Sequence, residues 1–322
     1  MVAAVANCAA TGAPAAAFSF ALLGDAPYGT FSELRFAAML REIGNDHSLQ
    51  FVLHVGDLKG SNEPCSDDLL RRRVAQLQAV PTALVYTPGD NDWTDCHRAA
   101  AGGFDPLERL VALRRIAYPD PRRSLGQRPL PLQSQADTES HNEFVENALF
   151  THEGVVFVTL HVVGSNNGLE PWRGIERSDH AEHPAGDRIV AFERRQAANL
   201  AWLETAFARA ETSGAPAVVI LMQANPRFDL APGHPRRAGF ETVIGALRRL
   251  ALRFGRPVLL AHGDMHFLVV DRPLAGETPP VSNLLRVQTY GEPLGGWVRI
   301  DVDPRRPEFF RVRPGGEDRV GN

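Results

Sequence analysis

Four apolar runs end in the same Gly-Asp step: Leu22-Leu23-Gly24-Asp25, His54-Val55-Gly56-Asp57, Thr87-Pro88-Gly89-Asp90-Asn91-Asp92 and Ala261-His262-Gly263-Asp264-Met265-His266. The residues before each step are those of a buried strand, and one Gly-Asp after a strand is ordinary turn chemistry. In α/β folds, however, functional side chains collect at the carboxyl ends of strands. Four such steps therefore predict four carboxylates on one rim of an α/β fold.

Helical patterns alternate with apolar runs on both sides of these loops. Helices are expected at 31–43, 67–80, 105–117, 189–210 and 240–254, and strands at 18–23, 51–55, 82–86, 155–163, 217–222 and 257–261. Beyond them the sequence predicts short strands separated by turns, at 267–270, 284–289, 297–302 and 309–312. This pattern indicates an α/β body closed by an antiparallel C-terminal run.

The composition limits the class of protein. The chain has 322 residues, of which 44% are apolar, and 34 Lys+Arg against 38 Asp+Glu give a net charge of −4. These values predict a folded globular protein without the basic surface of a nucleic-acid binder. No apolar run is long enough for a transmembrane segment. We expect residues 1–17 to be a disordered tail or the remnant of a signal peptide, and residues 18–322 to form one domain.

The ordered motifs resemble those of the calcineurin-like metallophosphoesterases, which include purple acid phosphatases and cyclic-nucleotide phosphodiesterases. The family's motifs are Asp-x-His, Gly-Asp, Gly-Asn-His-Asp/Glu, a lone His after a central strand, and Gly-His-x-His. The matching segments here are Asp25-Ala26-Pro27, Gly56-Asp57, Gly89-Asp90-Asn91-Asp92, Met222-Gln223-Ala224-Asn225-Pro226 and Gly263-Asp264-Met265-His266. The resemblance implies a four-layer α/β/β/α sandwich, with two central mixed β-sheets flanked by helices.

The resemblance also implies two divalent cations. Transferred residue by residue, it assigns Asp25, Asp57 and His266 to one ion, and Asp57, Asp90, Gln223 and Asp264 to the other. Of the family's five motif histidines only His266 is present, and the remaining donors are rich in oxygen. Hard ligands of this kind favour Mn, Mg or Ca over Zn or Fe.

The activity implied is hydrolysis of phosphate monoesters or diesters by a hydroxide that the two cations activate, with Asp57 bridging the ions. The chain would then be an enzyme, a phosphatase or phosphodiesterase acting on a small-molecule or phosphorylated substrate. Asn91 replaces the family's histidine that assists the leaving group. His97 is the first candidate for the missing acid, and a surface-loop histidine is the equal alternative.

Two other interpretations stay open. A noncatalytic metal- or ligand-binding protein that keeps the fold is favoured by the loss of four motif histidines, since fold does not fix function. In an ordinary α/β protein, the Gly-Asp turns would coincide by chance.

Several further residues carry expectations. Cys65 and Cys96 each follow one of two acidic loops that would be neighbours, so we expect a disulfide. That bond fits a periplasmic or secreted protein; without it the cytoplasm is the expected compartment. His161 alternates with apolar neighbours and is expected in the interior. Asn166 and Asn167 either face the acidic rim or form a plain turn.

Overall fold

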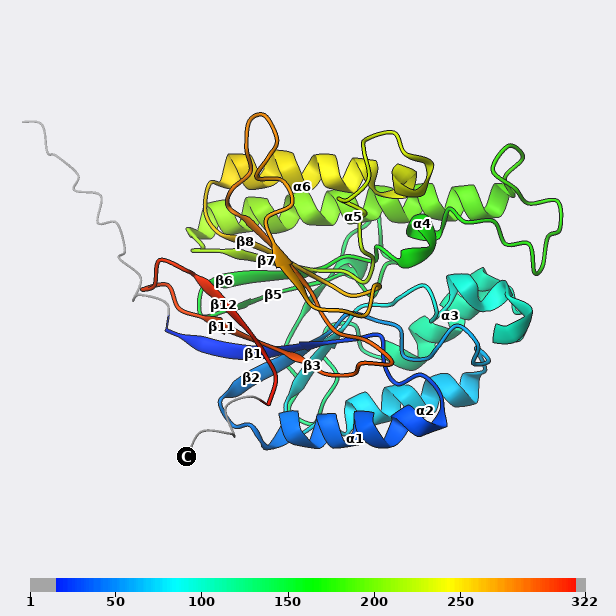
Figure 1. Cartoon of the computed structure of the whole chain (residues 1–322), viewed down its shortest axis with the longest axis horizontal. Coiled ribbons are helices and arrows are strands. Elements are labelled where there is room, and N and C mark those ends of the chain that lie inside the picture. The colour runs from blue at the N-terminus through cyan, green and yellow to red at the C-terminus, as the bar shows by residue number, and fades with distance from the viewer. Residues whose placement is uncertain (1–15, 317–322) are drawn as a thin grey trace, which may run out of the picture.

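Two β-sheets pack face to face at the centre of the computed structural model, which describes residues 16–316 (Figure 1). The first sheet has the order β12 (Phe310–Pro314), β11 (Val298–Val302), β1 (Phe18–Leu23), β2 (Leu49–His54) and β3 (Ala83–Tyr86). The second has the order β4 (Gln133–Ser134), β5 (Ala148–His152), β6 (Val155–Thr159), β7 (Val218–Leu221), β8 (Val258–His262), β10 (Leu284–Gln288) and β9 (Val269–Asp271). Both are mixed, because parallel central strands are joined to antiparallel edge strands.

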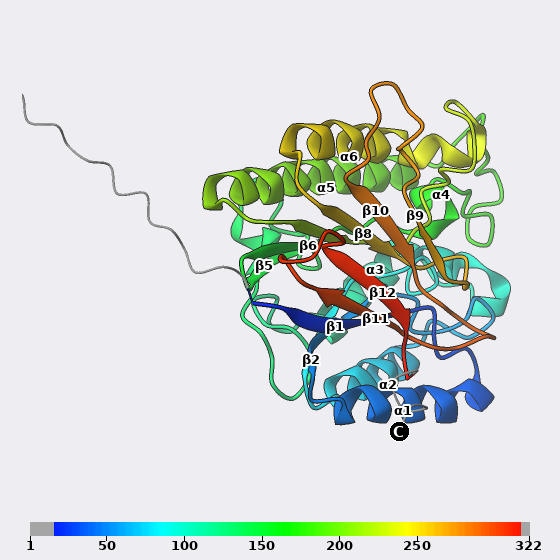
Figure 2. The same cartoon turned by 60° about the vertical axis from the view of Figure 1, so that its left-hand side comes forward.

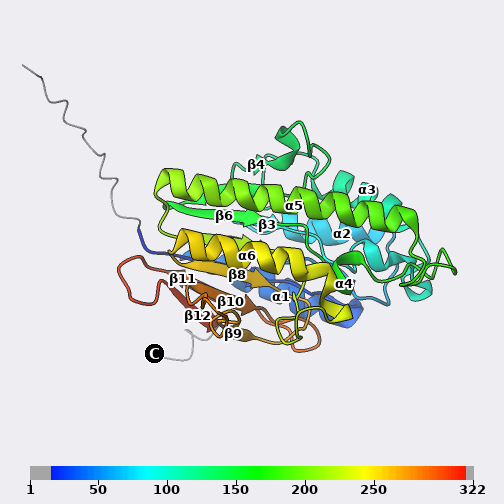
Figure 3. The same ribbon diagram turned by 90° about the horizontal axis from the view of Figure 1, so that it is seen from above.

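Helices cover the outer face of each sheet. The first sheet is covered by α1 (Thr30–Asn45), α2 (Asp67–Gln78) and α3 (Pro106–Ala117), and the second by α5 (Gly186–Ser213) and α6 (Glu241–Phe254). Figure 2 shows the four layers from a second direction, and Figure 3 shows α5 and α6 side by side. The expected four-layer α/β/β/α sandwich is confirmed.

Aromatic packing fixes the two sheets against each other. Phe20 and Phe51 of the first sheet stack at 5.4 Å between ring centroids, and Phe157 of the second sheet meets Phe51 edge-on at 5.2 Å. All three rings are fully or almost fully buried. The strands read as continuous apolar runs because their other faces are covered by helices. This rigid centre holds the strand ends that carry the acidic loops.

The predicted helix starts agree with the structure for local reasons. Ser66 caps α2 by accepting a hydrogen bond from the Leu69 amide, and two aspartates occupy the first turn. Asp105 caps α3 in the same way, with Pro106 at the first helical position. These short-range signals explain why both helices were recognisable in the sequence.

The structure corrects three expectations. The strand predicted at 155–163 ends at Thr159, because the side chains of Asn147 and Asn199 take the hydrogen bond of the His161 amide. The strands β4 and β5 were not predicted. The C-terminal strands do not form one antiparallel run, since β10 is parallel to β8 and β11 and β12 extend the first sheet.

Two sequence expectations concern the N-terminal tail and membrane-spanning segments. Residues 1–15 of the expected tail lie outside the described residues. Between residues 16 and 316, none of the helices combines the length and apolar character of a membrane span.

Candidate functional site

The four Gly-Asp loops meet where the two sheets adjoin. Asp25, Asp57 and Asp90 follow β1, β2 and β3 of the first sheet, and Asp264 follows β8 of the second. The Asp264 amide donates to Asp25 Oδ2 at 3.0 Å, which joins the two sheets. The Asn91 amide donates to Asp57 Oδ1 at 3.0 Å, which joins two loops of the first sheet. The structure therefore brings the four predicted carboxylates together.

Glycine is required in these loops because carboxylates from other loops approach so closely. A Cβ on Gly263 would lie 2.1 Å from Asp25 Oδ2, and one on Gly89 would lie 2.0 Å from Asp57 Oδ1. The aspartates themselves adopt a left-handed backbone, with φ of 50° at Asp25 and 56° at Asp57. Each such residue costs on the order of 1–3 kcal/mol, a form of strain that clusters at functional sites.

Asp57 is held by neutral donors from several elements. Its Oδ2 accepts hydrogen bonds from the Tyr28 hydroxyl at 3.0 Å, Asn91 Nδ2 at 2.8 Å and Gln223 Nε2 at 3.4 Å. Burial, together with the charge of Asp90, raises the pKa of Asp57 well above its ordinary value. Asp57 is therefore a buried acid whose surroundings lack a direct cationic partner among residues 16–316.

Asp25 leaves one oxygen without any partner. Its Oδ1 is buried, makes no hydrogen bond among the described residues, and lies 3.8 Å from His266 Nε2. His266 Nδ1 lies 2.6 Å from the Glu292 carbonyl oxygen, so Nδ1 donates to it and Nε2 is the ring nitrogen directed toward Asp25. Burial and the charge of Asp264 raise the pKa of Asp25. Asp25 Oδ1 and His266 Nε2 thus lie close together, without a hydrogen bond between them among the described residues.

Asp90 and Asp264 approach each other beside Gly164. A Cβ on Gly164 would lie 2.5 Å from Asp90 Oδ2 and 3.1 Å from Asp264 Oδ1. Burial and the charge of Asp90 raise the pKa of Asp264 to about 7. The Ser165 hydroxyl lies 2.9 Å from Asp90 Oδ2 and 2.8 Å from Asp95 Oδ1, so it links this pair to a fifth carboxyl group.

Gln223 lies in the cluster with its amide nitrogen inward. Its Oε1 accepts the Gly164 amide hydrogen bond at 2.6 Å, which fixes the orientation of the side chain. Nε2 therefore faces Asp57, and a nitrogen of this kind does not ligate a cation. The ligand role expected for Gln223 stays a prediction. It requires the side-chain amide to rotate so that Oε1 replaces Nε2 beside Asp57.

The two residues expected to assist the leaving group lie in different surroundings. Asn91 is in the cluster, bound to Asp57, whereas His97 lies at the end of η1 (Thr94–His97). His97 is buried, and its Nδ1 accepts a hydrogen bond from the Gly174 amide at 3.2 Å. Burial and Arg98 lower the pKa of His97 to about 4, so it is neutral at pH 7. No hydrogen bond or ion pair among residues 16–316 joins His97 to the four carboxylates, and its acid role stays a prediction.

Sequence reasoning did not single out two residues that organise the cluster. Asp92 Oδ2 accepts hydrogen bonds from the amides of Asp57 and Gly89 and from the Tyr86 hydroxyl, at 2.8–2.9 Å, so it fixes the two loops to each other. Tyr28 donates to Asp57 and lies 3.5 Å from His266 Nε2. Tyr28 stands three residues after Asp25, but nothing in that spacing predicts the contact with Asp57.

The segment α4 (Gly164–Gly168) is a turn with a left-handed backbone. Ser165, Asn166 and Asn167 have φ of 49°, 56° and 56°, at a cost of roughly 1–2 kcal/mol per residue. The Asn166 and Asn167 side-chain amides donate to the carbonyl oxygens of Pro235 and Gly239, both at 3.0 Å. These bonds stabilise the turn, so the two asparagines form a turn and do not face the acidic rim.

The interior assignment of His161 is confirmed. Its side chain is fully buried, and Nδ1 lies 2.6 Å from Glu146 Oε1.

A hard divalent cation fits the donor set. The unpartnered Asp25 Oδ1 and the clustered carboxylate oxygens are the donors that such an ion prefers, and His266 Nε2 adds one nitrogen beside them. Among residues 16–316, no three His, Cys, Asp or Glu side chains already stand in a coordinating arrangement. At Asp57, the Tyr28 hydroxyl and two side-chain amides donate to Oδ2, the oxygen that a cation would also use.

The raised pKa values predict how stability depends on pH in protein stripped of metal with a chelator. Asp264 and Asp95 have folded pKa values of about 7 and about 8, whereas both are ionised in the unfolded chain above about pH 4. Between about pH 6.5 and 8 the folded state therefore binds more protons, and the free energy of unfolding falls as the pH rises. Below about pH 6.5 the neutral buried His54 and His262, with pKa values of about 3, act in the opposite direction.

Urea titrations across this range measure the effect, and the Asp264→Asn variant should show a flatter profile. Stability that rises from about pH 6.5 to 8 in the stripped protein would contradict the assignment.

Comparisons with known proteins support the fold. No protein-family model matches the sequence, and no curated protein matches it. Among solved structures, "Structure of PhoD" is similar with a TM-score of 0.54 and 15% identity, covering 94% of this chain and 70% of that one. Phosphopantetheinyl hydrolase (PptH) from Mycobacterium tuberculosis has a TM-score of 0.44 at 11% identity, covering 96% of this chain and 100% of that one. TT1561 of Thermus thermophilus has a TM-score of 0.46 at 10% identity, covering 93% and 99%. The chain thus shares the sandwich fold of the PhoD structure.

Proposed function

We propose that this chain is a metal-dependent phosphoesterase with its centre at the four Gly-Asp loops. The observation that supports this best is the buried, unpartnered Oδ1 of Asp25 within a group of four carboxylates. Burying like charges without a counter-ion is costly, and raised pKa values are the result. Divalent cations remove this cost, and the resemblance between these motifs and those of metallophosphoesterases indicates the same chemistry.

The residues divide into two groups of ligands that share Asp57. Asp25, Asp57 and His266 would hold one ion, and Asp57, Asp90 and Asp264 the other, with Gln223 joining through Oε1 after its amide turns. The donors are mostly oxygen, so Mn, Mg or Ca is the expected metal. When bound, such ions lower the pKa of water and neutralise negative charge on the phosphoryl group.

The chain's own polar groups would then orient the substrate. Asn91 Nδ2 and the Tyr28 hydroxyl donate to Asp57 Oδ2 in the described structure. With the charge of Asp57 directed to metal, both donors become free to bind phosphoryl oxygens. Arg98 is partly exposed, forms an ion pair with Asp95 at 2.7 Å, and lies 3.4 Å from the Ser165 hydroxyl, so its remaining N–H donors face the place proposed for the substrate.

A second candidate is a noncatalytic protein that keeps this fold. The specific observation in its favour is that neutral donors from Tyr28, Asn91 and Gln223 already satisfy Asp57. Carboxyl groups that are partly protonated and accept hydrogen bonds from neutral donors can stay buried in the folded protein without a metal ion.

Cation binding and turnover, measured on the same sample, separate the two candidates. Chelator-treated protein is titrated with Mn, Mg, Ca and Zn by calorimetry, and then assayed with 4-nitrophenyl phosphate and bis(4-nitrophenyl) phosphate. We expect Mn or Mg to bind and to restore hydrolysis of at least one ester. Binding without any turnover would support the noncatalytic candidate. Absence of binding by all four metals would contradict the proposed centre.

The leaving group should strongly affect the rate. With Asn91 in place of a histidine, the position beside Asp57 offers no imidazolium to a poor leaving group, and His97 is neutral and bound to Gly174. A general acid contributes about 10²–10⁴ in rate, so aryl phosphates should be hydrolysed much faster than alkyl phosphates.

Three proteins test this prediction on one aryl and one alkyl phosphate: the unaltered chain, Asn91→His and His97→Ala. Asn91→His should narrow the difference between the substrates, and His97→Ala should leave it unchanged. If His97→Ala slows only the alkyl ester, His97 is the acid after all.

We also propose that the protein works outside the cytoplasm, in the periplasm or as a secreted protein. The support is the disulfide between Cys65 and Cys96, a bond that persists in oxidising compartments.

A further inference from the structure

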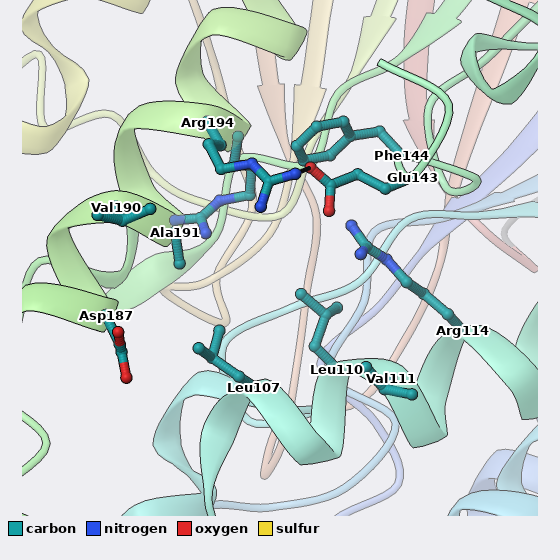
Figure 4. A pocket seen from close by; sticks show the side chains of 11 residues that line it. Leu107, Leu110, Val111, Arg114, Glu143, Phe144, Asp187, Val190, Ala191 and Arg194 are labelled. Atoms are coloured by element: carbon teal, nitrogen blue, oxygen red, sulfur yellow. Dashed lines mark ion pairs between the residues drawn. The ribbon is translucent and has the colours of Figure 1, made fainter. Parts of the chain in front are cut away.

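A pocket of about 320 Å³ lies between α3 and α5, lined by residues outside the acidic loops (Figure 4). Leu107, Leu110 and Val111 of α3 form one side of it, and Val190 of α5 forms the other. Val111 and Val190 are 64% and 52% exposed, high values for large apolar side chains. The pocket therefore offers an open apolar surface on two helices.

The rest of the lining carries both signs of charge and two apolar groups: Arg114, Arg194, Arg195, Glu143, Asp187, Phe144 and Ala191. Arg194 forms an ion pair with Glu143 at 2.5 Å, which Figure 4 shows as a dashed line. Arg114 binds the buried Glu146 through Nε at 3.0 Å and Nη2 at 2.7 Å. These two guanidinium groups are thus neutralised by carboxylates.

Arg195 differs from both, because no carboxylate among the described residues forms an ion pair with it. Its side chain lines the pocket and is 2% exposed. Nη2 donates to the Asn167 carbonyl oxygen at 2.6 Å, and the guanidinium lies 5.1 Å above the Trp93 ring. Nε is buried without a hydrogen-bond partner. The nearest stabilising charge is that of Glu146, which is already paired with Arg114. A buried guanidinium without a directly bonded counter-ion is costly, and the unused Nε–H is a donor for an anion.

We propose that this pocket binds a small organic anion with an apolar tail, a carboxylate or a phosphate monoester. The anionic group binds Arg195, with Arg194 beside it, and the tail lies along Leu110, Val111 and Val190. A guanidinium group binds either a carboxylate or a phosphate through two parallel hydrogen bonds. The pocket therefore selects a negatively charged head group that has two oxygens side by side. The volume is at the lower end for small-molecule sites, which suits a short chain.

This site is separate from the acidic loops, although Arg195 is connected to them through Asn167 of α4 and through Trp93, which follows Asp92. Arg195 binds Asn167 of α4, and Ser165 of the same turn binds Asp90. Replacing Arg195 therefore disturbs α4 as well as the pocket. For this reason the test also needs a variant of the apolar wall, which does not touch α4.

Calorimetric titrations with octanoate, octyl phosphate and inorganic phosphate test the proposal. They are done on the whole chain in the presence of a chelator, which keeps cations away from the acidic loops. We expect saturable binding of octanoate, octyl phosphate or both, and the arm that binds identifies the head group. Inorganic phosphate should bind at least about tenfold more weakly than octyl phosphate, since it lacks the buried tail.

Three variants locate the bound anion. Arg195→Gln and Val190→Asp should each weaken binding about tenfold or more, because one removes a charge-assisted hydrogen bond and the other puts a carboxylate beside the tail. Arg249→Gln, on the exposed side of α6, is the matched control and should bind as the unaltered protein does.

Failure of both octyl compounds to bind at millimolar concentration overturns the proposal. Unchanged affinity in both Arg195→Gln and Val190→Asp overturns it as well. Neither result bears on metal binding at the acidic loops.

Discussion

Replacing Asp57 by Asn is expected to remove cation binding and to lower metal-dependent hydrolysis by about 10³-fold or more. Asp57 accepts a hydrogen bond from Tyr28, whose hydroxyl lies near His266 of one proposed ion site. It also accepts one from Gln223, which belongs to the other proposed site. A carboxylate in this position serves both proposed ions, and its amide replacement also places an N–H group against existing donors. The loss should therefore exceed that of any other single change in the cluster.

Metal content and turnover measured together check this prediction. Asp25→Asn and Asp90→Asn, each belonging to one proposed ion, should retain more bound metal than Asp57→Asn. Asp68→Asn, on the exposed surface of α2, is the control for the chemistry of the substitution. An Asp57→Asn protein with unchanged metal content would show that the shared-ligand assignment is wrong.

Breaking the Cys65–Cys96 bond is expected to lower the free energy of unfolding by about 3–4 kcal/mol. The bond, expected from the sequence and confirmed by the structure, joins residues 31 positions apart. The segment it closes contains α2, β3 and the loop that carries Asp90. Both sulfur-bearing side chains are fully buried, so the double variant also loses packing.

Urea unfolding of the double variant Cys65→Ser/Cys96→Ser, compared with the oxidised protein, measures this loss. The remaining cysteine, Cys8, lies outside the described residues, and Cys8→Ser serves as the control. Equal stability of the double variant and the control would mean that the bond does not constrain the unfolded chain.

The parts of the fold that were predictable depend on signals within a few residues. Strand ends were marked by Gly-Asp, and helix starts by Ser66 and Asp105 with their neighbouring charges. Because parallel strands end at a common edge, the convergence of Asp25, Asp57 and Asp90 also followed from the pattern. The short strands β4 and β5, which pair with each other, were not predicted at this level.

The details of the site depend on contacts between distant segments. Gln223 was expected to offer an oxygen, but the Gly164 amide, 59 residues away in sequence, fixes its orientation. His97 is six residues from Asn91, yet its ring is bound by Gly174. The left-handed turn α4 is held by a hydrogen bond from the Asn167 side chain to the Gly239 carbonyl oxygen, which is distant in the sequence. No pattern in one segment contains this information.

The strand order of the first sheet has a consequence for synthesis on the ribosome. β1 lies between β2 and β11, and Phe18 is paired with Val302. One edge of β1 therefore has no native partner until residues 298–302 have left the exit tunnel. Over that interval the nascent chain exposes an apolar strand edge, which invites incorrect pairing with other chains. Asp25 follows this strand and also needs β8 before it meets Asp264. The candidate site can therefore assemble only after the chain has been synthesised beyond His266, well after the residues of β1 have been made.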